Sequence, residues 1–343
     1  MSELVRAALA RVMSGATLGR DEARAAMGAV MAGEATPAQL AGLLIALHSR
    51  GETVDELAGF AQAMRERVVP VQAPAGTVDT CGTGGDGSGT FNISTAAALV
   101  VAGADVPVAK HGNRAVTSQA GSADVLEALG VPIDHGPEQA AESIEAHNFA
   151  FLFAPAYHPA MRHAGPVRRE LGVPTCFNLL GPMTNPAAVR RQVVGVADPR
   201  AAARVAHVLH ALGAERAFVV HGDGVDELPL DDSGVLYDVS PAGVRRRRVD
   251  AARFGLRHAP RDELRGGTAA ENAAHIEAVL SGRERGPHRD VVLLNAGAAL
   301  LAAGRSRNLS AGVRRAEQTI DQGAAMGLLE RLRSANGASR RVA

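Results

Sequence analysis

A glycine-rich segment between Thr77 and Thr95, TVDTCGTGGDGSGTFNIST, constrains this chain more than any other stretch. Thr77 and Val78 are typical of a buried strand, and the apolar run after Thr95 is typical of a helix. Five glycines lie between Gly82 and Gly89, where a tight turn without a ligand needs only one or two. A strand, a glycine-rich turn and a helix N-terminus present backbone N–H groups to an anion. The segment therefore predicts a phosphate-binding loop.

Two common phosphate-binding motifs fit this loop poorly. Gly82–Gly87 matches the G-x-G-x-x-G pattern of dinucleotide-binding proteins, but that fingerprint also needs an acidic residue at the end of the second strand. Here Asp105 precedes the predicted strand Val106–Ala109, and the turn Lys110–Arg114, KHGNR, follows it. The Gly-Lys-Ser/Thr ending of a nucleoside triphosphate loop is also absent. The cationic turn favours a second phosphate contact over a ribose contact.

Composition excludes several classes of protein. The 343 residues are 46% hydrophobic, which predicts a globular core, and 36 basic residues balance 36 acidic ones. A general nucleic-acid-binding protein would carry a basic excess. The two cysteines, Cys81 and Cys176, suit neither a disulfide framework nor a metal site. Without a signal-peptide pattern or an apolar run of membrane-spanning length, we expect a cytoplasmic location.

Hydrophobic periodicity predicts a helical N-terminal part followed by an α/β part. Between residues 2 and 68 apolar residues recur at helical spacing, and Thr36 and Thr53 are typical helix caps. From Thr77 onward strands alternate with helices, which favours a mainly parallel sheet with ligands at the carboxyl ends of its strands. We expect a small helical domain of residues 1–70, joined by about 159–187, and a large α/β domain of residues 71–158 and 188–343. The predicted later elements are strands Phe149–Phe153, Val193–Ala197 and Ala217–His221 and helices Ser122–Leu129, Glu138–His147 and Arg200–Leu212.

An acidic segment, HGDGVDEL, follows the predicted strand that ends at His221. It carries Asp223, Asp226 and Glu227, and such a cluster is typical of either a magnesium site or an acidic surface turn. If a pyrophosphate lies nearby, the magnesium site is favoured, because the metal neutralises the charge of the phosphate oxygens.

A basic segment, residues 158–171, provides candidates for binding a second substrate. Gly165-Pro166 interrupts any helix there, and Pro166 is suited to open the next one, which puts Arg168 in a first helical turn beside small residues. A guanidinium in such a place has room to bind a planar carboxylate through two hydrogen bonds. His158 and His163 of the same segment are as compatible with packing as with ligand binding.

Longer motifs carry a family resemblance. DTCGTGGDGSGTFNIST followed by AKHGNRAVTSQAGSADVLEALGV resembles the anthranilate phosphoribosyltransferases, and HPAMRHAGPVRRELG, FNLLGPMTNP and HGDGVDEL resemble the same family in the same order. The resemblance implies a nucleoside phosphorylase/phosphoribosyltransferase-like fold. It also implies transfer of the phosphoribosyl group of phosphoribosyl pyrophosphate (PRPP) to the amine of anthranilate, giving N-(5-phosphoribosyl)anthranilate and pyrophosphate in tryptophan biosynthesis. Positioning and charge neutralisation drive such a reaction, so no acid, base or nucleophile is assigned.

The resemblance also implies a set of binding residues. Those implied for PRPP are Gly82, Gly85, Asp86, Thr90, Asn92, Ile93, Ser94, Thr95, Lys110, His111, Gly112, Asn113, Arg114, Ala115, Val116, Thr117, Ser118 and Ser122. Those implied for anthranilate are Gly82, Asn113 and Arg168, and those implied for magnesium, as two ions, are Ser94, Asp226 and Glu227. The residues themselves suggest that Ser122 caps the helix that it precedes.

A homodimer and two alternative functions complete the expectations. We expect dimerisation through the helical domain, because Leu40, Leu43, Leu44 and Leu47 offer more apolar surface than four short helices bury. A pyrimidine nucleoside phosphorylase of similar architecture is one alternative, disfavoured by the KHGN turn and the DGVDEL acids. A non-catalytic nucleic-acid-binding relative of the fold is the other, disfavoured by the balanced charge.

Overall fold

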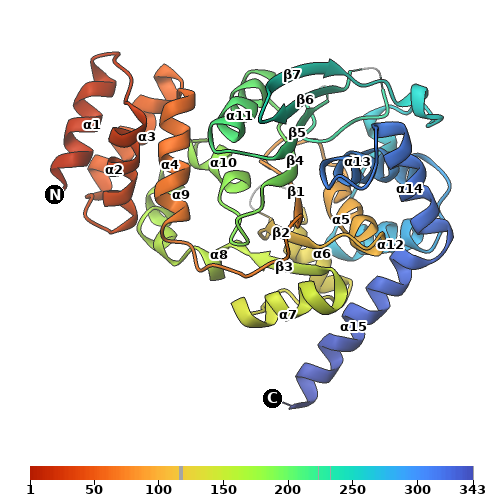
Figure 1. Ribbon diagram of the computed structural model, residues 1–343. Coiled ribbons are helices and arrows are strands. Elements are labelled where there is room, and N and C mark those ends of the chain that lie inside the picture. The colour runs from red at the N-terminus through yellow and green to blue at the C-terminus, as the bar shows by residue number, and fades with distance from the viewer. Residues whose placement is uncertain (116–118, 223, 232, 343) are drawn as a thin grey trace.

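The computed structural model describes residues 1–115, 119–222, 224–231 and 233–342, with the backbone alone for 337–342. Four helices occupy its N-terminal end (Figure 1): α1 Glu3–Met13, α2 Arg20–Met31, α3 Pro37–Arg50 and α4 Val54–Arg65. Thr36 and Thr53 are the N-caps of α3 and α4, as predicted, and the structure shows a capping box at each. Leu40, Leu43, Leu44 and Leu47 are each at most 2% exposed, because α3 packs them inside the chain. We expected these leucines to leave apolar surface exposed for a dimer interface, and that expectation is wrong.

A seven-stranded sheet forms the centre of the molecule, in the order β3-β2-β1-β4-β5-β6-β7. The strands β1 to β5 pair in parallel, and β6 and β7 add an antiparallel hairpin at one edge. The mainly parallel sheet is confirmed. The strands are β1 Val78–Gly82, β2 Val108–Gly112, β3 Phe149–Phe153, β4 Arg191–Gly195, β5 Arg216–His221, β6 Val235–Ser240 and β7 Gly243–Arg248.

Successive residues of the central strands enter different hydrophobic cores. Val193 of β4 and Phe218 of β5 face a core built with α5, α13, α14 and α15, whereas Val194 and Val219 face a core shared with α11 and the N-terminal helices. The helices after the N-terminal four are α5 Ile93–Gly103, α6 Ser122–Ala128, α7 Pro137–His147, α8 Ala154–Tyr157, α9 Gly165–Leu171, α10 Phe177–Leu180, α11 Pro199–Ala211, α12 Ala269–Leu280, α13 Pro287–Ala302, α14 Leu309–Asp321 and α15 Ala324–Val342. Short 3₁₀ helices cover Pro159–His163, Gly181–Met183, Ala251–Phe254 and Arg261–Leu264.

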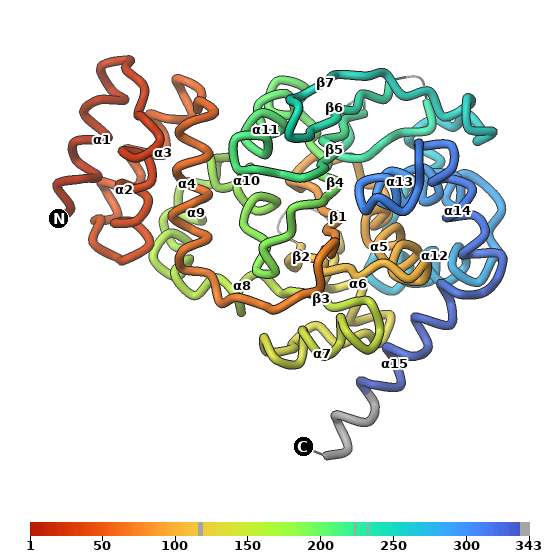
Figure 2. The backbone as a smooth tube through the Cα atoms, viewed as in Figure 1, coloured from red at the N-terminus to blue at the C-terminus, as the bar shows by residue number. Residues whose placement is uncertain are grey.

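The segment between β3 and β4 returns to the N-terminal helices. Helix α9 packs against α3, and α10 packs against α4 (Figure 2). The Arg65 guanidinium donates to the carbonyl of Met183 at 2.6 Å, and Val71 N–H donates to the carbonyl of Pro186 at 3.0 Å. These contacts agree with a discontinuous helical domain, and the domain boundaries stay a prediction.

Strand β2 begins two residues later than its sequence predicts. Pro107 has no N–H to donate to a ladder, and its carbonyl accepts from Val78 N–H at 2.9 Å before the strand starts. Lys110, His111 and Gly112 therefore belong to the strand and not to a turn after it. The side chains of Lys110 and His111 are consequently buried.

Two further details differ from the expectations. Gly121, not Ser122, is the N-cap of α6, and the Asp124 carboxylate accepts from Gly121 N–H at 2.9 Å. Ser122 is the first helical residue, and its hydroxyl donates to the carbonyl of Asn113 at 3.3 Å. In the described part of the chain, no helix combines the length and apolarity needed to cross a bilayer.

Candidate active site

The glycine-rich loop follows β1 and leads into α5. Gly84, Gly85, Gly87 and Gly89 have φ between 63° and 73°, a region that other residues enter at a cost. Two further glycines make room for a second loop: a Cβ on Gly82 would lie 2.1 Å from the Asp226 carboxylate, and one on Gly195 would lie 1.5 Å from the Asp226 carbonyl oxygen. The glycines thus serve both loop conformation and the close approach of an acidic segment.

The acidic segment after β5 meets this loop directly. Asp226 Oδ2 accepts from Gly84 N–H at 3.1 Å, and Glu227 Oε1 accepts from Ser94 N–H at 2.9 Å. The three predicted metal-binding residues Ser94, Asp226 and Glu227 therefore lie together, although more than 130 positions separate Ser94 from the acids in the sequence. Asp223, the third acid that the sequence suggested, lies outside the described residues.

Asn295 of α13 holds the end of the acidic segment. Its Oδ1 accepts from Leu228 N–H at 3.0 Å, and its Nδ2 donates to the Leu228 carbonyl at 3.0 Å and to the Val291 carbonyl at 2.9 Å. Sequence reasoning missed Asn295, because a lone Asn in an apolar helix carries no motif. A polar residue inside that otherwise apolar run was the only available signal.

Burial makes the acidic segment electrostatically unusual. Burial, reinforced by the neighbouring Asp86 carboxylate, raises the pKa of Asp226 to about 7. Burial and the charge of Asp226 also raise the pKa of Glu227 well above its ordinary value. The Lys110 ammonium, 1% exposed, donates to the Thr80 carbonyl at 2.5 Å and to the Ser94 hydroxyl at 3.4 Å. Burial lowers the pKa of Lys110, against the opposing charge of Asp79.

The donor set suits a divalent cation that also binds substrate oxygens. Among the described residues, the buried Asp86 Oδ2 has no hydrogen-bond partner, and Asp86 lies close enough to Asp226 and Glu227 to raise the pKa of both. Lys110 is a cation that interacts with Asp226 and Glu227. Among the described residues no three His, Cys, Asp or Glu side chains form a complete metal site. Magnesium characteristically takes one or two carboxylates and completes its shell with water and phosphate oxygens. The residues present fit that mode of binding.

The N-cap and first turn of α5 contain three more of the predicted PRPP-binding residues, Asn92, Ile93 and Thr95. Asn92 is the N-cap, and its Nδ2 donates to the Ala120 carbonyl at 3.2 Å. Ile93 and Thr95 are buried, and the Thr95 hydroxyl finds no hydrogen-bond partner within the described residues. Thr90 forms an isolated antiparallel bridge with Arg265. The glycine-rich loop is therefore anchored at its α5 end and open at Gly84 to Gly89, where an added Cβ would meet nothing.

The segment after β2 is held by an acid of α6. Arg114 forms ion pairs of 2.8 Å with both Asp124 and Glu127, and Asp124 also accepts from Ala115 N–H at 2.9 Å. The Arg114 charge is thus engaged within the chain. Gly112 allows close packing, because a Cβ there would lie 2.3 Å from the Ser122 hydroxyl. Val116, Thr117 and Ser118, also predicted to bind phosphate, lie outside the described residues.

Two buried histidines form a pair behind this segment. His111 Nδ1 lies 3.3 Å from the Gly181 carbonyl, and His111 Nε2 lies 3.2 Å from His158 Nε2. Because a carbonyl only accepts, the His111 proton is on Nδ1, and His158 donates from Nε2 to the bare Nε2 of His111. Burial, with the His158 charge, lowers the pKa of His111 to about 3, and burial lowers that of His158 to about 4. Both rings are neutral at neutral pH.

The histidine pair predicts a pH dependence of stability. Histidines in the unfolded chain take up protons near pH 6.5, whereas the folded pair takes them up only near pH 4 and below. The free energy of unfolding is therefore highest above pH 6.5 and decreases as the pH drops from 6.5 toward 4. Each histidine contributes a slope of about 1.4 kcal/mol per pH unit in that window. Urea unfolding between pH 7.5 and 5 should show a shallower slope for His158→Gln than for the native chain. Equal slopes would contradict the buried neutral pair.

A network of buried side chains joins β1, β2 and the FNLLGPMTNP motif. Asn185 Nδ2 donates to Asp79 Oδ2 and to the Ala109 carbonyl, both at 2.8 Å, and Asp79 Oδ1 accepts from His111 N–H at 3.2 Å. Asp79 lies inside β1, where its side chain is fully buried. The network holds the part of β2 that carries Lys110 and His111 in place.

Arg168 lies on α9, as a half-buried residue. Its guanidinium lies over the Phe177 ring at 5.1 Å from the centroid, and burial lowers its pKa. Within the described chain Arg168 forms no ion pair, so its charge is available to a ligand. Arg169, the next residue, is exposed. His163, the histidine with an undecided role, lies against Gly33, where an added Cβ would approach its ring at 2.7 Å.

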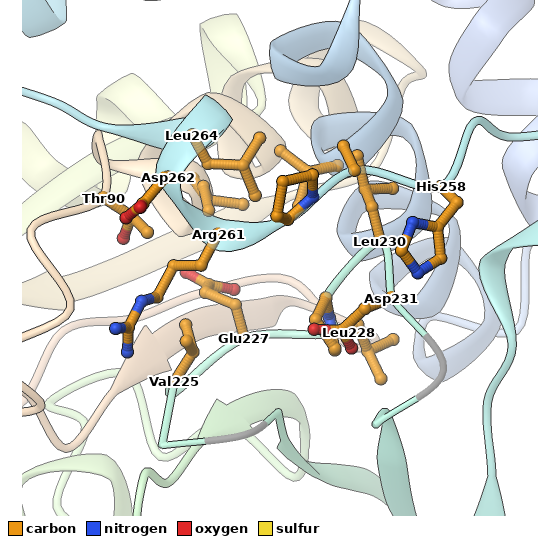
Figure 3. A pocket seen from close by; sticks show the side chains of 15 residues that line it. Thr90, Val225, Glu227, Leu228, Leu230, Asp231, His258, Arg261, Asp262 and Leu264 are labelled. Atoms are coloured by element: carbon orange, nitrogen blue, oxygen red, sulfur yellow. The ribbon is translucent and has the colours of Figure 1, made fainter.

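A cavity of about 390 Å³ borders the acidic segment. Its wall includes Thr90 and Glu227 from the candidate site, and Figure 3 shows Arg261 extending toward the end where Glu227 and Val225 lie. The other wall comes from residues 258–264, which sequence reasoning did not connect with the site. The glycine-rich loop, the acids and this cavity thus form one continuous region at the carboxyl ends of β1 and β5.

Comparisons with known proteins agree across the chain. A family model described as "Glycosyl transferase family, helical bundle domain" matches residues 6–68, and one described as "Glycosyl transferase family, a/b domain" matches residues 75–326. The anthranilate phosphoribosyltransferase of Thermomicrobium roseum is 53% identical over 336 residues, which is 96% of both chains. The crystal structure of the Thermus thermophilus anthranilate phosphoribosyltransferase superposes with a TM-score of 0.91 at 48% identity, over 96% of this chain and 99% of that one. The Saccharomyces cerevisiae enzyme in complex with PRPP and Mg has a TM-score of 0.89 at 26% identity, over 98% of this chain and 99% of that one.

Proposed function

The chain belongs to the anthranilate phosphoribosyltransferase family, and on that premise we propose how its own residues divide the work of the reaction. It is a pentosyltransferase of tryptophan biosynthesis, which moves the phosphoribosyl group of PRPP to the amine of anthranilate and releases pyrophosphate. One observation carries the assignment of residues: Asp226 and Glu227 accept hydrogen bonds from Gly84 N–H and Ser94 N–H of the glycine-rich loop.

The donor occupies the glycine-rich loop in this proposal. The backbone N–H groups between Gly82 and Gly89 and the N-terminus of α5 face the pyrophosphate oxygens. Asp226, Glu227 and the Ser94 hydroxyl hold magnesium, as two ions, and the bound metal supplies charge neutralisation for the pyrophosphate leaving group. Lys110 contributes a positive charge beneath the same loop through its contact with Ser94. Asn113, Ala115 and Ser122, close to one another after β2, complete the donor site.

The acceptor occupies the space beside α9 in this proposal. Arg168 binds the anthranilate carboxylate through two hydrogen bonds, and its stacking on Phe177 keeps the guanidinium plane in place. Gly82 and Asn113 approach the ring from the donor side. The amine then attacks the ribose carbon opposite the departing pyrophosphate, so positioning and leaving-group neutralisation supply the rate enhancement.

One assay tests the overall function. Anthranilate fluorescence should decay when the protein is mixed with PRPP and magnesium, and it should persist when PRPP or magnesium is left out. A persistent signal in the complete mixture, with the protein folded, would contradict the activity.

We also propose a homodimer through the helical domain and a cytoplasmic location. The location rests on the similarity to a biosynthetic enzyme. The dimer now rests on Leu4 of α1 and Ile45 of α3, which are 52% and 38% exposed on helices that pack together. The domain division into 1–70 with about 159–187, and 71–158 with 188–343, is likewise a proposal.

Light scattering at micromolar concentration should give twice the chain mass of 35.3 kDa. Ile45→Glu should shift the mass toward that of a single chain, because a charge on an apolar interface is costly to bury. A native protein that already scatters as a monomer would contradict the dimer.

A further inference from the structure

Asn272, near the start of α12, connects two segments that are distant in the sequence. The residue is 2% exposed. Its Oδ1 accepts from Gly267 N–H at 2.7 Å, and its Nδ2 donates to Asn92 Oδ1 at 2.9 Å across a separation of 180 positions. Asn92, the N-cap of α5, in turn donates from Nδ2 to the Ala120 carbonyl at 3.2 Å.

This chain of hydrogen bonds has only one possible direction. Gly267 N–H can only donate, and the Ala120 carbonyl can only accept. Asn272 must therefore turn its oxygen to Gly267 and its NH₂ to Asn92, and Asn92 must turn its oxygen to Asn272 and its NH₂ to Ala120. Flipping either amide would place two acceptors or two donors face to face. Asn272 and the Ala120 carbonyl together thus hold the Asn92 amide in one orientation beside the glycine-rich loop.

The backbone around Asn272 approaches the loop closely. Gly266 N–H donates to the Gly89 carbonyl at 2.8 Å, and Phe91 N–H donates to the Leu264 carbonyl at 3.0 Å. A Cβ on Gly266 would lie 2.6 Å from Asn272 Oδ1 and 2.7 Å from the Phe91 Cα. Residues 264–267 therefore lie along the end of the glycine-rich loop, and Asn272 closes the contact from behind.

We propose that Asn272 is a positioning residue for PRPP binding, which acts through Asn92 at the junction of the glycine-rich loop and α5. The inference rests on the proposed contact of Asn92 with PRPP. Asn272 does not touch the substrate in this arrangement. Its side-chain hydrogen bonds within the described part of the chain go to Gly267 and Asn92, whereas the proposed anthranilate site lies on α9. Its loss should weaken use of PRPP selectively.

Asn272→Asp is the sharpest single test, because it keeps the shape and the acceptor for Gly267 N–H but replaces the donor to Asn92 by an acceptor. We expect the KM for PRPP to rise about tenfold or more and the KM for anthranilate to stay within about twofold. Calorimetry with PRPP and magnesium, without anthranilate, should show the same loss of affinity. Asn336→Asp is the matched control, since it removes a comparable amide donor, here to the Gly130 carbonyl.

A double-mutant cycle separates positioning from a structural role. If Asn272 acts through Asn92, the variant Asn92→Ala/Asn272→Ala should bind PRPP no more weakly than Asn92→Ala alone. Additive losses, or equal rises in both KM values together with a lower Tm, would overturn the inference. Unchanged PRPP binding in Asn272→Ala and Asn272→Asp would also overturn it. If Asn92→Ala itself binds PRPP normally, the contact assigned to Asn92 fails, and the inference fails with it, while the fluorescence assay of the native chain still reports the activity independently.

Discussion

Replacing Asp226 and Glu227 together with Ala is expected to abolish turnover and leave the fold intact. The two carboxylates would hold the magnesium that neutralises the leaving pyrophosphate, and such neutralisation contributes several kcal/mol of transition-state stabilisation. A loss of about 4 kcal/mol corresponds to about a thousandfold in kcat. The measurement is anthranilate consumption at saturating magnesium.

Stability should survive this double substitution because burial disfavours the charged form of both acids. Folding raises the pKa of both carboxyl groups, so each one destabilises the folded chain once the pH exceeds the pKa that the group has in the unfolded chain. Replacing these carboxyl groups removes that destabilisation. The thermal unfolding temperature at pH 8 should therefore not fall. Asp262→Ala is the matched control, because this exposed acid of the neighbouring cavity pairs with Arg265. Retained turnover in a folded double variant would rule out the metal-binding role.

Asp226→Asn separates charge from loop contact. The amide oxygen keeps an acceptor for Gly84 N–H, so the loop geometry is preserved while the negative charge is lost. We expect most of the activity loss of the double variant to appear in this single variant. A loss that appears only when the hydrogen bond is also removed would assign Asp226 to loop positioning.

Arg168→Ala is expected to raise the KM for anthranilate and to change the KM for PRPP little. A charge-assisted contact to a carboxylate is worth roughly 1.5–3 kcal/mol, so the expected rise is about ten- to a hundredfold. The guanidinium has no ion pair among the described residues, and thus its loss leaves no acid uncompensated. Steady-state kinetics with each substrate varied in turn provide the measurement.

Two further variants make this second prediction specific. Arg168→Lys should rescue only in part, because an ammonium cannot match both carboxylate oxygens or stack on Phe177 as a planar group does. Arg169→Ala is the control, an exposed neighbour on the same helix. A larger anthranilate defect in Arg169→Ala, or a selective PRPP defect in Arg168→Ala, would show that the carboxylate binds elsewhere.

Local patterns predicted most elements of the fold. The helix caps at Thr36 and Thr53 and the strand Phe149–Phe153 agree with the structure, since a cap or a short apolar run involves only a few adjacent residues. The strand containing Lys110 was misplaced by two residues, because the start of a strand depends on the pairing partner available beside it. The leucines of α3 were assigned to an interface because their burial partners in other helices were invisible in the sequence.

The sequence by itself determined the glycine-rich loop, the helical and α/β parts, the acidic and basic segments, and through long motifs the family. Only the tertiary structure decided that Glu227 meets Ser94, that Arg114 is engaged by α6, and that Asn272 orients Asn92. The physical reason is the sequence separation between the residues that interact. Caps, turns and periodicity act between residues a few positions apart, whereas these contacts join separate elements and depend on how the whole chain packs. Strand order and register bring Ser94 and Glu227 together across 133 positions, and helix packing brings Asn92 and Asn272 together across 180.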